Sequence, residues 1–457
     1  MNDDIQNEII GNIDEIYENA SEELIRSLIG KYFVPTNEEM ALNAEISTPV
    51  LLVDEMLNLI PEEFWTKPKK VIEPCCGKGN FVLGIFDKFY NGLKNSIPDI
   101  SERCEVIMKE CIYFCDLTEI NVFITTEILK RHIKMFSKVK NIDYLFNSWI
   151  GNTLTMDTKS IFGLNKFHAV IGNPPYSKFK SGIKKGGYGG KSLWDKFVVC
   201  ALENLISKSG YLLFVHPPSW RKPEHYLWKI LSSKQILYLR SMSEKNGKLL
   251  FGCATLTDYY LLKNVDTFMN TEFIGEDDIH YSVDLRLLNF LPSGCVYDIL
   301  KLVGISDVVY SSSFYDTRRK HMTQNVLYSR TFYGTDQKEI FLESDTMSVY
   351  PIIHSMTKKN GIGIIYSKED RGHFNIPKVI LSLGRNQYPY NDWKGNYGMS
   401  QSCFGLEIDN KEDGDNIVKA INTDKFKKIL KYTKWNTYQT EWRMFKYFKE
   451  DFWKEFV

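Results

Sequence analysis

The sequence lacks an excess of charge of either sign, with 57 Lys and Arg against 57 Asp and Glu among 457 residues. A protein that coats nucleic acid without sequence preference must neutralise many phosphates, so this balance argues against that class. It still allows a groove with a locally positive lining. Hydrophobic residues at 43% and charged residues at 25% are ordinary for a folded globular chain.

Patterns of metal ligands, disulfides and membrane spans are also missing. The nine cysteines form no CxxC pair, Cys75 and Cys76 are adjacent, and the eight histidines are scattered. We therefore expect no metal, no disulfide framework and a reducing compartment. The acidic N-terminus lacks the order of a signal peptide, and no apolar run reaches the roughly 18 residues of a membrane span. These absences predict a soluble, cytoplasmic protein that makes no membrane contact.

The length suggests two or three domains, since a domain usually holds about 100–200 residues. Residues 1–43 are expected to form an N-terminal helical extension, with one amphipathic helix over 1–30. From 44 to 264, short apolar runs alternate with helical stretches, which favours an α/β fold with a doubly wound, Rossmann-like sheet. This alternation of apolar runs and helical stretches ends after residue 264, and 265–457 is expected to be a second, α+β domain. The expected strands are 70–72, 111–115, 167–172, 210–215 and 254–262.

The first motif is VIEPCCGKGNF, from Val71 to Phe81. A strand is expected to end at Glu73, with Gly77 and Gly79 in a tight turn before a helix. Glycine lets the backbone approach a ligand closely, and a helix start offers free N–H groups. The stretch lacks the Lys followed by Ser or Thr of a phosphate loop. A ligand-binding turn and a purely structural turn both stay open at this point.

The second motif is an acidic residue, Asp116, directly after the expected strand 111–115. At the tip of the second strand of a nucleotide-type βαβ unit, such a residue can accept hydrogen bonds from both ribose hydroxyls. Its distance of about 40 residues from the turn exceeds the usual ~20 and requires an insertion in 88–105. The alternative is a surface Asp that caps the next helix.

The sharpest motif is NPPY at 173–176, directly after the apolar run FHAVIG. Two consecutive prolines fix an extended backbone and remove two N–H donors, leaving carbonyls that point outward. The side-chain oxygen of Asn173 and the carbonyl of Pro174 can then accept from one amino group. Tyr176 offers a face on which a planar base can stack. A mere turn is the alternative, which the position at the end of a core strand disfavours.

These residues resemble the γ-class N6-adenine-specific DNA methyltransferases of restriction–modification systems. Ser47-Thr48-Pro49, then EPCCGKG, then NPPY stand in that family's order, and the resemblance covers about 44–262. It implies a Rossmann-like catalytic domain over 44–264 that uses S-adenosyl-L-methionine, followed by a target-recognition domain over 265–457. Double-stranded DNA is the implied partner, and a cognate restriction endonuclease on a separate chain would fit.

The resemblance also implies roles for individual residues. The implied cofactor-binding residues are Thr48, Pro49, Glu73, Pro74, Cys76, Gly77, Gly79, Phe81, Asp116, Asn152 and Asn173. The implied catalytic residues are Asn173, Pro174, Pro175 and Tyr176, and the implied contacts to the target base are Tyr176 and Phe251. Three positions depart from the family's pattern: Glu73 and Cys75 replace the usual Asp and Ala, and His168 replaces an Asp.

Two basic segments could face DNA. The Gly-rich loop carries Lys178, Lys180, Lys184, Lys185 and Lys191, which could meet phosphates, although a solvated linker is the alternative. In 421–457, basic residues outnumber acidic ones and alternate with Tyr and Trp, which suits a DNA-facing surface. For 440–455 we favour an amphipathic helix that packs onto the core.

The expected reaction is methylation of the exocyclic nitrogen of an adenine that has left the duplex stack. Several alternatives use the same tetrapeptide. Enzymes that modify a glutamine of release factors lack a Thr-Pro segment so placed, and cytosine amino-methylation usually goes with Ser in place of Asn173, so both rank lower. Methylation of an adenine or guanine in RNA stays open. A non-catalytic DNA-binding relative is the reading from another class, and the intact Gly turn and NPPY argue against it.

Overall fold

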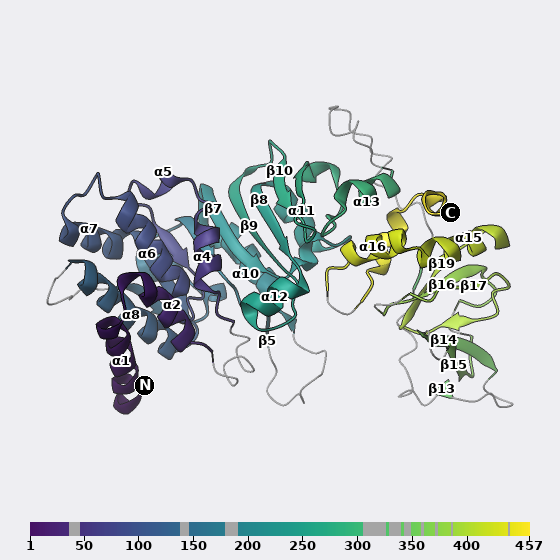
Figure 1. Cartoon of the computed structure of the whole chain (residues 1–457), viewed down its shortest axis with the longest axis horizontal. Coiled ribbons are helices and arrows are strands. Elements are labelled where there is room, and N and C mark those ends of the chain that lie inside the picture. Colours follow the sequence, from purple (N-terminus) through teal and green to yellow (C-terminus); the bar gives the residue numbers. More distant parts are fainter. Residues whose placement is uncertain are drawn as a thin grey trace. The chain divides into compact units, whose positions relative to one another are not determined.

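The computed structural model comprises two compact units, residues 1–217 with 229–273 and residues 218–228 with 274–457. Figure 1 labels the helices and strands along the chain. The functional roles expected for 1–43, 44–264 and 265–457 stay predictions. The structure describes residues 1–35, 46–137, 146–178, 191–304, 326–328, 340–341, 349–357, 361–370, 373–384, 387–436 and 439–457.

The first unit is built on one twisted sheet. Neighbouring strands follow the order β10-β8-β9-β7-β4-β1-β2-β3. Strands β1 to β4 and β7 pair in parallel, whereas β9 runs antiparallel to β7 and β8. This order confirms the doubly wound α/β fold expected from the sequence. The strands are β1 (Val71–Glu73), β2 (Ile112–Asp116), β3 (Asn147–Ile150), β4 (Phe167–Gly172), β7 (Ile206–His216), β8 (Lys234–Met242), β9 (Thr257–Asp266) and β10 (Thr271–Ile274).

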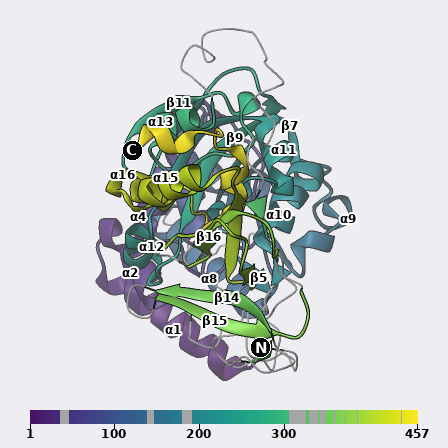
Figure 2. The same ribbon diagram turned by 90° about the vertical axis from the view of Figure 1, so that its right-hand side faces the viewer.

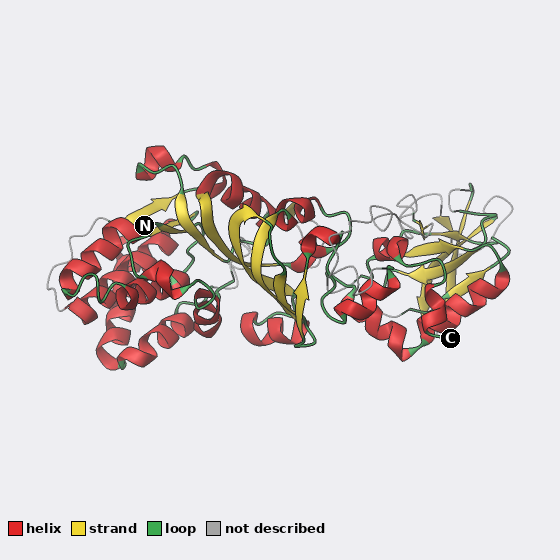
Figure 3. Ribbon diagram, turned by 90° about the horizontal axis from the view of Figure 1, so that it is seen from above, coloured by secondary structure: helices red, strands yellow, loops and turns green. Residues whose placement is uncertain are grey.

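Helices cover both faces of this sheet (Figure 3). Helices α6 and α8 contact β2, and α4 contacts β9. Every residue of β1 and β2 is buried, as expected for parallel strands with both faces covered. The helices of this part of the chain are α4 (Val50–Leu57), α5 (Glu62–Trp65), α6 (Asn80–Gly92), α7 (Ile100–Val106), α8 (Glu119–Ser137), α9 (Thr158–Phe162), α10 (Trp194–Cys200), α11 (Tyr226–Ser232) and α12 (Glu244–Phe251).

The expected strands agree with the observed ones to within a few residues. The run 167–172 coincides with β4, while β1 and β2 each begin one residue later than expected. The strand expected at 254–262 is β9, which starts at Thr257 because Gly252, at the end of α12, adopts a positive φ of 70° and turns the chain first. The insertion expected in 88–105 contains α7, whose Arg103 donates to the carbonyls of Tyr90, Ile97 and Pro98.

The N-terminal extension corrects one expectation, because residues 1–30 form two helices rather than one. Helix α1 spans Asp3–Asn19 and α2 spans Glu22–Tyr32. Ala20 and Ser21 between them have extended backbone, and Ser21 occupies the N-cap position of α2. Helix α1 contacts α8, and α2 contacts α4 and α6, so both add an outer layer to the first unit.

The second unit contains two four-stranded sheets, with orders β12-β19-β16-β17 and β13-β15-β14-β18. Figure 2 shows β14 and β15 side by side. A core of apolar side chains lies between the sheet of β16 and β19 and helices α15 and α16. The elements are β11 (His280–Val283), α13 (Val296–Leu302), β12 (Val326–Leu327), β13 (Ile340–Phe341), β14 (Tyr350–Thr357), β15 (Gly361–Ser367), β16 (Lys378–Ser382), β17 (Tyr390–Asp392), β18 (Gly398–Met399), β19 (Cys403–Glu407), α15 (Lys411–Asn422) and α16 (Asp424–Tyr432).

The C-terminal segment packs as expected but is not an α-helix. It forms two 3₁₀ helices, η7 (Trp442–Tyr447) and η8 (Phe452–Glu455), separated by extended backbone at Phe448. Phe445, Phe448 and Phe452 are buried in the core of the second unit. Within the described residues, no helix combines the length and apolar character needed to cross a membrane.

Candidate active site

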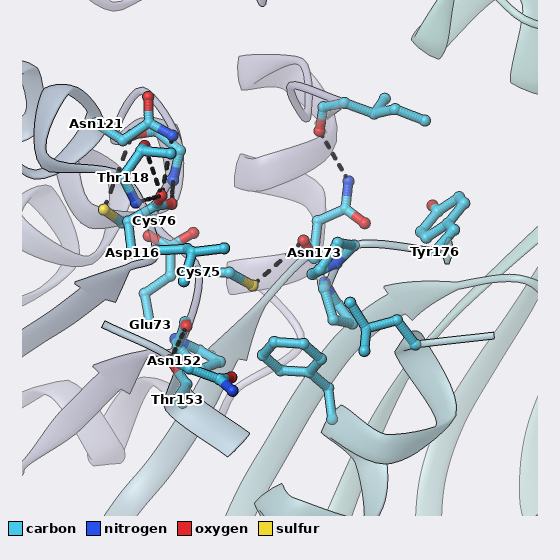
Figure 4. Close-up of a pocket in the computed structure, with 18 of the residues that line it drawn as sticks. Glu73, Cys75, Cys76, Asp116, Thr118, Asn121, Asn152, Thr153, Asn173 and Tyr176 are labelled. Carbon is cyan, nitrogen blue, oxygen red and sulfur yellow. Dashed lines mark hydrogen bonds between the residues drawn. The ribbon is translucent and has the colours of Figure 1, made fainter. Parts of the chain in front are cut away.

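A cavity of about 740 Å³ opens at the carboxyl ends of the central strands of the first unit. Its walls come from the chain directly after β1, β2, β3 and β4, from residues 46–48, and from the start of α10. Strand β1 lies between β2 and β4 in the sheet, so the chain winds away from β1 in both directions. Ligands of open α/β sheets bind at such a switch point. Figure 4 shows the side chains that line the cavity.

The Gly-rich turn forms one wall, between β1 and the start of α6. Gly77 and Gly79 both have positive φ values, 49° and 86°. A Cβ at Gly79 would lie 3.0 Å from the Oγ1 of Thr125, so glycine is required there for space as well as for conformation. The backbone N–H of Cys76 donates to the carbonyl of Cys115 at 2.8 Å, which fixes the turn against β2.

Asp116 holds this turn with both carboxylate oxygens. Its Oδ2 accepts from the backbone N–H of Gly77 at 3.0 Å. Its Oδ1 accepts from the N–H and the hydroxyl of Thr118, both at 2.9 Å, and from Nδ2 of Asn121 at 3.1 Å. Asp116 therefore supports the start of α8, as the capping alternative requires, and also lines the cavity. Its expected contact with ribose hydroxyls stays a prediction.

Glu73 lies at the base of the cavity and is only 2% exposed. Burial, and then the nearby Asp116, raise the pKa of this carboxyl well above its ordinary value, while a hydrogen bond from the backbone of Val82 opposes the shift. Among the described residues, Oε2 of Glu73 has no hydrogen-bond partner. The site therefore contains a buried carboxyl group with one oxygen still available.

The NPPY motif forms the opposite wall. Nδ2 of Asn173 donates to the carbonyl of Ile46 at 3.2 Å and to Oγ1 of Thr48 at 3.1 Å. Both N–H groups of the amide are thereby used, and Oδ1 is buried with no partner among the described residues. The thiol of Cys75 donates to the backbone carbonyl of Asn173 at 3.4 Å, which joins the two walls (Figure 4).

Tyr176 lies beside Asn173 and lines the same cavity (Figure 4). Its hydroxyl is buried and has no hydrogen-bond partner within the described residues. Burial first, then Cys253 and Asp258, raise the pKa of this phenol, so it stays protonated. Its ring and the available oxygen of Asn173 therefore face one space, as a planar amine-bearing ligand requires.

Most of the expected site residues meet at this cavity. The expected residues that line it are Thr48, Glu73, Pro74, Cys76, Gly77, Phe81, Asp116, Asn152, Asn173, Pro174, Pro175 and Tyr176. Pro49 and Gly79 lie directly next to lining residues, with Pro49 at the N-cap of α4. Asn152 is exposed at the rim, where its Oδ1 accepts from the N–H of Leu154 at 3.2 Å.

One expected residue is not brought to the cavity, and most of the basic loop lies outside the described residues. Phe251 is the last residue of α12, packs against the main core of the first unit, and is absent from the cavity lining. Its contact with the target base stays a prediction. Of the basic loop, only the backbone of Lys178 in β5 (Ser177–Lys178) and of Lys191 in β6 (Lys191–Ser192) is described. The remaining lysines, Lys180, Lys184 and Lys185, lie outside the described residues.

Several lining residues were not expected from the sequence. Asn80 donates to Oγ of Ser47 at 3.1 Å and to the carbonyl of Thr48 at 2.8 Å. Lys78 donates to Oδ1 of Asn121 at 2.7 Å. Asn80 directly follows the Gly turn at the start of a helix, so its position in GKGN was a usable signal. The lining residues Leu193, Lys196 and Phe197 around α10 had no sequence signal, because only the fold brings them here.

The departure from the family's pattern at His168 has a local explanation. Nδ1 of His168 accepts from the backbone N–H of Lys70 at 3.0 Å. Burial, then Lys69 and Lys70, lower the pKa of this imidazole, so the neutral form that can accept is favoured. The substituted ring thus supplies an acceptor at the beginning of β4, away from NPPY at the other end of the strand. Among the described residues, no group of acidic, His and Cys side chains is suited to hold a metal ion.

The strand order, with a cavity at the carboxyl ends of the central strands, defines a Rossmann-like fold. The structure titled as a DrdV–DNA complex matches with a TM-score of 0.50 at 11% identity, covering 88% of this chain and 56% of that one. A Listeria monocytogenes protein described as a class I S-adenosylmethionine-dependent methyltransferase matches at 12% identity, over 57% of this chain and 70% of that one, with a TM-score of 0.34.

Residues 108–246 match the model of the Eco57I restriction-modification methylase family. A Mycoplasma pneumoniae protein described as an adenine-specific methylase is 26% identical over 266 residues, which is 45% of this chain and 60% of that protein. These matches confirm the resemblance to N6-adenine methyltransferases of restriction–modification systems. The chain thus aligns with about three-fifths of the length of this curated relative.

Proposed function

We propose that this protein transfers the methyl group of S-adenosyl-L-methionine to the N6 nitrogen of an adenine flipped out of double-stranded DNA. The observation that carries the proposal is the amide of Asn173. Both of its N–H groups are bound to protein, and its oxygen is buried without a partner in a cavity that extends to Gly77. A buried acceptor left unpaired costs about 1–3 kcal/mol, which a ligand N–H would recover.

The cavity fits the proposed cofactor in size and charge. Its volume of about 740 Å³ lies in the usual range for small-molecule and cofactor sites. Glu73 and Asp116 both line it, and a cationic ligand near Glu73 would favour the ionised form of that carboxyl group. The available Oε2 of Glu73 is one further acceptor for such a ligand. When bound, the cofactor supplies an electrophilic methyl group on a sulfonium centre.

The residues of NPPY act on the amine rather than on the methyl group. An exocyclic amine of adenine is a weak nucleophile because its lone pair is delocalised into the ring. Oδ1 of Asn173 and the carbonyl of Pro174 accept hydrogen bonds from the two N–H groups of this amine. These hydrogen bonds draw the nitrogen toward tetrahedral geometry. The same two oxygens stabilise the positive charge that develops on nitrogen. The surplus proton leaves to water after the new N–C bond has formed.

Tyr176 supplies the stacking surface that offsets base flipping. Removing a base from the duplex costs a few kcal/mol. A base–aromatic contact returns about 1–3 kcal/mol. The ring of Tyr176 lines the cavity beside Asn173, so a base that donates to Asn173 lies within reach of that ring.

Recognition of a DNA sequence is proposed for the second unit, with residues 421–457 as candidates. Helix α16 has four exposed lysines, Lys425, Lys427, Lys428 and Lys431, and it buries Phe426 and Ile429 on its other side. The family description names restriction–modification enzymes, which supports a cognate endonuclease on a separate chain as a further partner.

The proposal is tested by methylation of a plasmid library with the purified protein, followed by sequencing that detects methyladenine. We expect methyladenine within one recurring sequence, and none with Asn173→Ala. Transfer to RNA alone would support the RNA alternative. Cofactor binding without transfer to DNA or RNA would contradict the proposal, and absence of both binding and transfer would support a non-catalytic relative.

A further inference from the structure

The orientation of the Asn173 amide is fixed by a segment from a different part of the chain. Residues 46–48 precede α4 and lie 125 residues or more before Asn173 in sequence. The carbonyl of Ile46 can only accept, so an amide rotated by half a turn would place Oδ1 against another acceptor. The Ile46 carbonyl therefore selects the orientation in which Nδ2 faces residues 46–48 and Oδ1 points away from them, and Thr48 accepts from the second N–H.

This segment is held in turn by the first residue of α6. Nδ2 of Asn80 donates to the carbonyl of Thr48 and to the hydroxyl of Ser47. Asn80 is 7% exposed and Thr48 is 4% exposed, so these bonds are shielded from water. The hydrogen bonds thus run from the Gly turn through Thr48 to Asn173.

We propose that Thr48 is a positioning residue that orients the Asn173 amide for the target amine, and that Asn80 holds Thr48 in place for this task. The inference rests on the proposed function and goes beyond the cofactor contact that the family resemblance implies for Thr48. Loss of the hydroxyl leaves one buried N–H of Asn173 without its acceptor. The amide then samples orientations in which Oδ1 no longer faces the amine.

The matched variants are Thr48→Val, which keeps the side-chain shape, and Thr48→Ser, which keeps the hydroxyl. We expect Thr48→Val to lower kcat about 10- to 100-fold, as for loss of a hydrogen bond to a buried polar group. Affinity for S-adenosylhomocysteine should stay within about threefold, and Thr48→Ser should recover most of the turnover. Thr158→Val is the control for loss of a buried threonine hydroxyl, because Thr158 donates to Asn165 and does not line the cavity.

A second measurement reads the amide directly and needs no methyl transfer. In protein labelled with ¹⁵N-asparagine, the side-chain signal of Asn173 is identified by its loss in Asn173→Asp. We expect hydrogen exchange of this NH₂ group to be at least about tenfold faster in Thr48→Val than in the wild type, and near the wild-type rate in Thr48→Ser and Thr158→Val.

The two measurements separate this inference from the proposed function. Unchanged exchange in Thr48→Val overturns the positioning role, whatever the turnover. A loss of cofactor affinity with unchanged exchange overturns it as well, and assigns Thr48 to the cofactor alone. Faster exchange in a protein that methylates no nucleic acid supports the positioning role while removing the proposed function.

Discussion

The two walls of the cavity differ in how completely their polar groups are satisfied. On the Gly-turn wall, Asp116 accepts four hydrogen bonds from protein donors, one of them from Gly77. On the NPPY wall, the oxygen of Asn173 and the hydroxyl of Tyr176 are buried without partners among the described residues. Two further lining side chains are intermediate. A backbone hydrogen bond reaches the carboxyl group of Glu73 but its Oε2 is unpaired, and Nδ2 of Asn80 donates to residues 47 and 48 while its Oδ1 is unpaired among the described residues.

This difference separates the groups that shape the site from those that await a ligand. The hydrogen bond that Asp116 accepts from Gly77 holds the Gly turn in its conformation before any ligand arrives. Unpaired buried oxygens lower stability and are retained where a ligand completes them. Hydrogen bonds within the protein thus fix the backbone of the Gly-turn wall, whereas the NPPY wall offers unpaired oxygens that can accept hydrogen bonds from a ligand. Variants on the two walls should therefore fail in different measurements.

The largest effect is expected for Asn173→Ala. It removes the available acceptor, and kcat should fall by at least about 100- to 1000-fold, comparable to the removal of a transition-state hydrogen-bond partner. Cofactor affinity should change no more than a few-fold, because the Gly turn is untouched. Single-turnover methyl transfer and titration calorimetry with the cofactor measure the two quantities. A variant that loses cofactor binding yet methylates DNA at excess cofactor would contradict the role of the NPPY wall.

The opposite pattern is expected for Asp116→Ala. Removing four accepted hydrogen bonds loosens the Gly turn and the start of α8, so we expect cofactor affinity to fall about 10- to 100-fold, with kcat at saturating cofactor affected less. Asp99→Ala is the matched control, because Asp99 caps α7 by accepting from the N–H of Glu102 outside the cavity. Equal losses in the two variants would mean that Asp116 acts on stability alone.

The comparison also shows which parts of the site a sequence can predict. The Gly turn, Asp116 and NPPY each follow directly on an apolar strand, and parallel strands bring their carboxyl ends to one edge. Motif positions therefore predicted the fold, and most of the site residues they named line one cavity. The hydrogen bonds of Asn173 to residues 46–48 had no such signal, because they depend on tertiary packing of a segment that precedes the first strand.

Other features depended on local backbone geometry that residue patterns do not specify. The single helix expected over 1–30 is divided at Ala20 and Ser21, although the apolar spacing continues across them. The helix expected over 440–455 is replaced by two 3₁₀ helices, and Phe445, Phe448 and Phe452 of this segment are buried. In both cases the segment packs onto its unit as expected, but the element differs, since burial constrains spacing more than hydrogen-bond type.

A smaller effect, on stability, is expected for Glu73→Gln. Burial and Asp116 raise the pKa of the Glu73 carboxyl well above its ordinary value of 4.5. In the unfolded chain this group loses its proton above that pH, while the folded protein retains it. The folded state then binds more protons, so the free energy of unfolding falls as the pH rises from 4.5 toward the folded pKa.

The glutamine side chain does not titrate, so the free energy of unfolding of the variant should lack this fall with pH. The variant should therefore become more stable relative to the wild type as the pH rises. About 1 kcal/mol corresponds to roughly 2–4 °C in Tm for a unit of this size. Thermal unfolding of both proteins across a pH series measures the difference. A difference in Tm that is constant with pH would show that Glu73 does not retain its proton on folding.

The smallest effect is expected for Tyr176→Phe, and it tests whether the two unpaired oxygens of the NPPY wall are alike. The hydroxyl of Tyr176 is buried without a partner, so its removal should leave stability unchanged or raise it by up to about 1 kcal/mol. Turnover should fall at most about threefold, because the ring that stacks on the base remains. Tyr176→Ala removes the ring and should weaken binding of a 2-aminopurine-substituted DNA by about 1–3 kcal/mol. A loss of tenfold or more in Tyr176→Phe would mean that this hydroxyl also binds the base, and that the NPPY wall presents two ligand-binding oxygens from side chains instead of one.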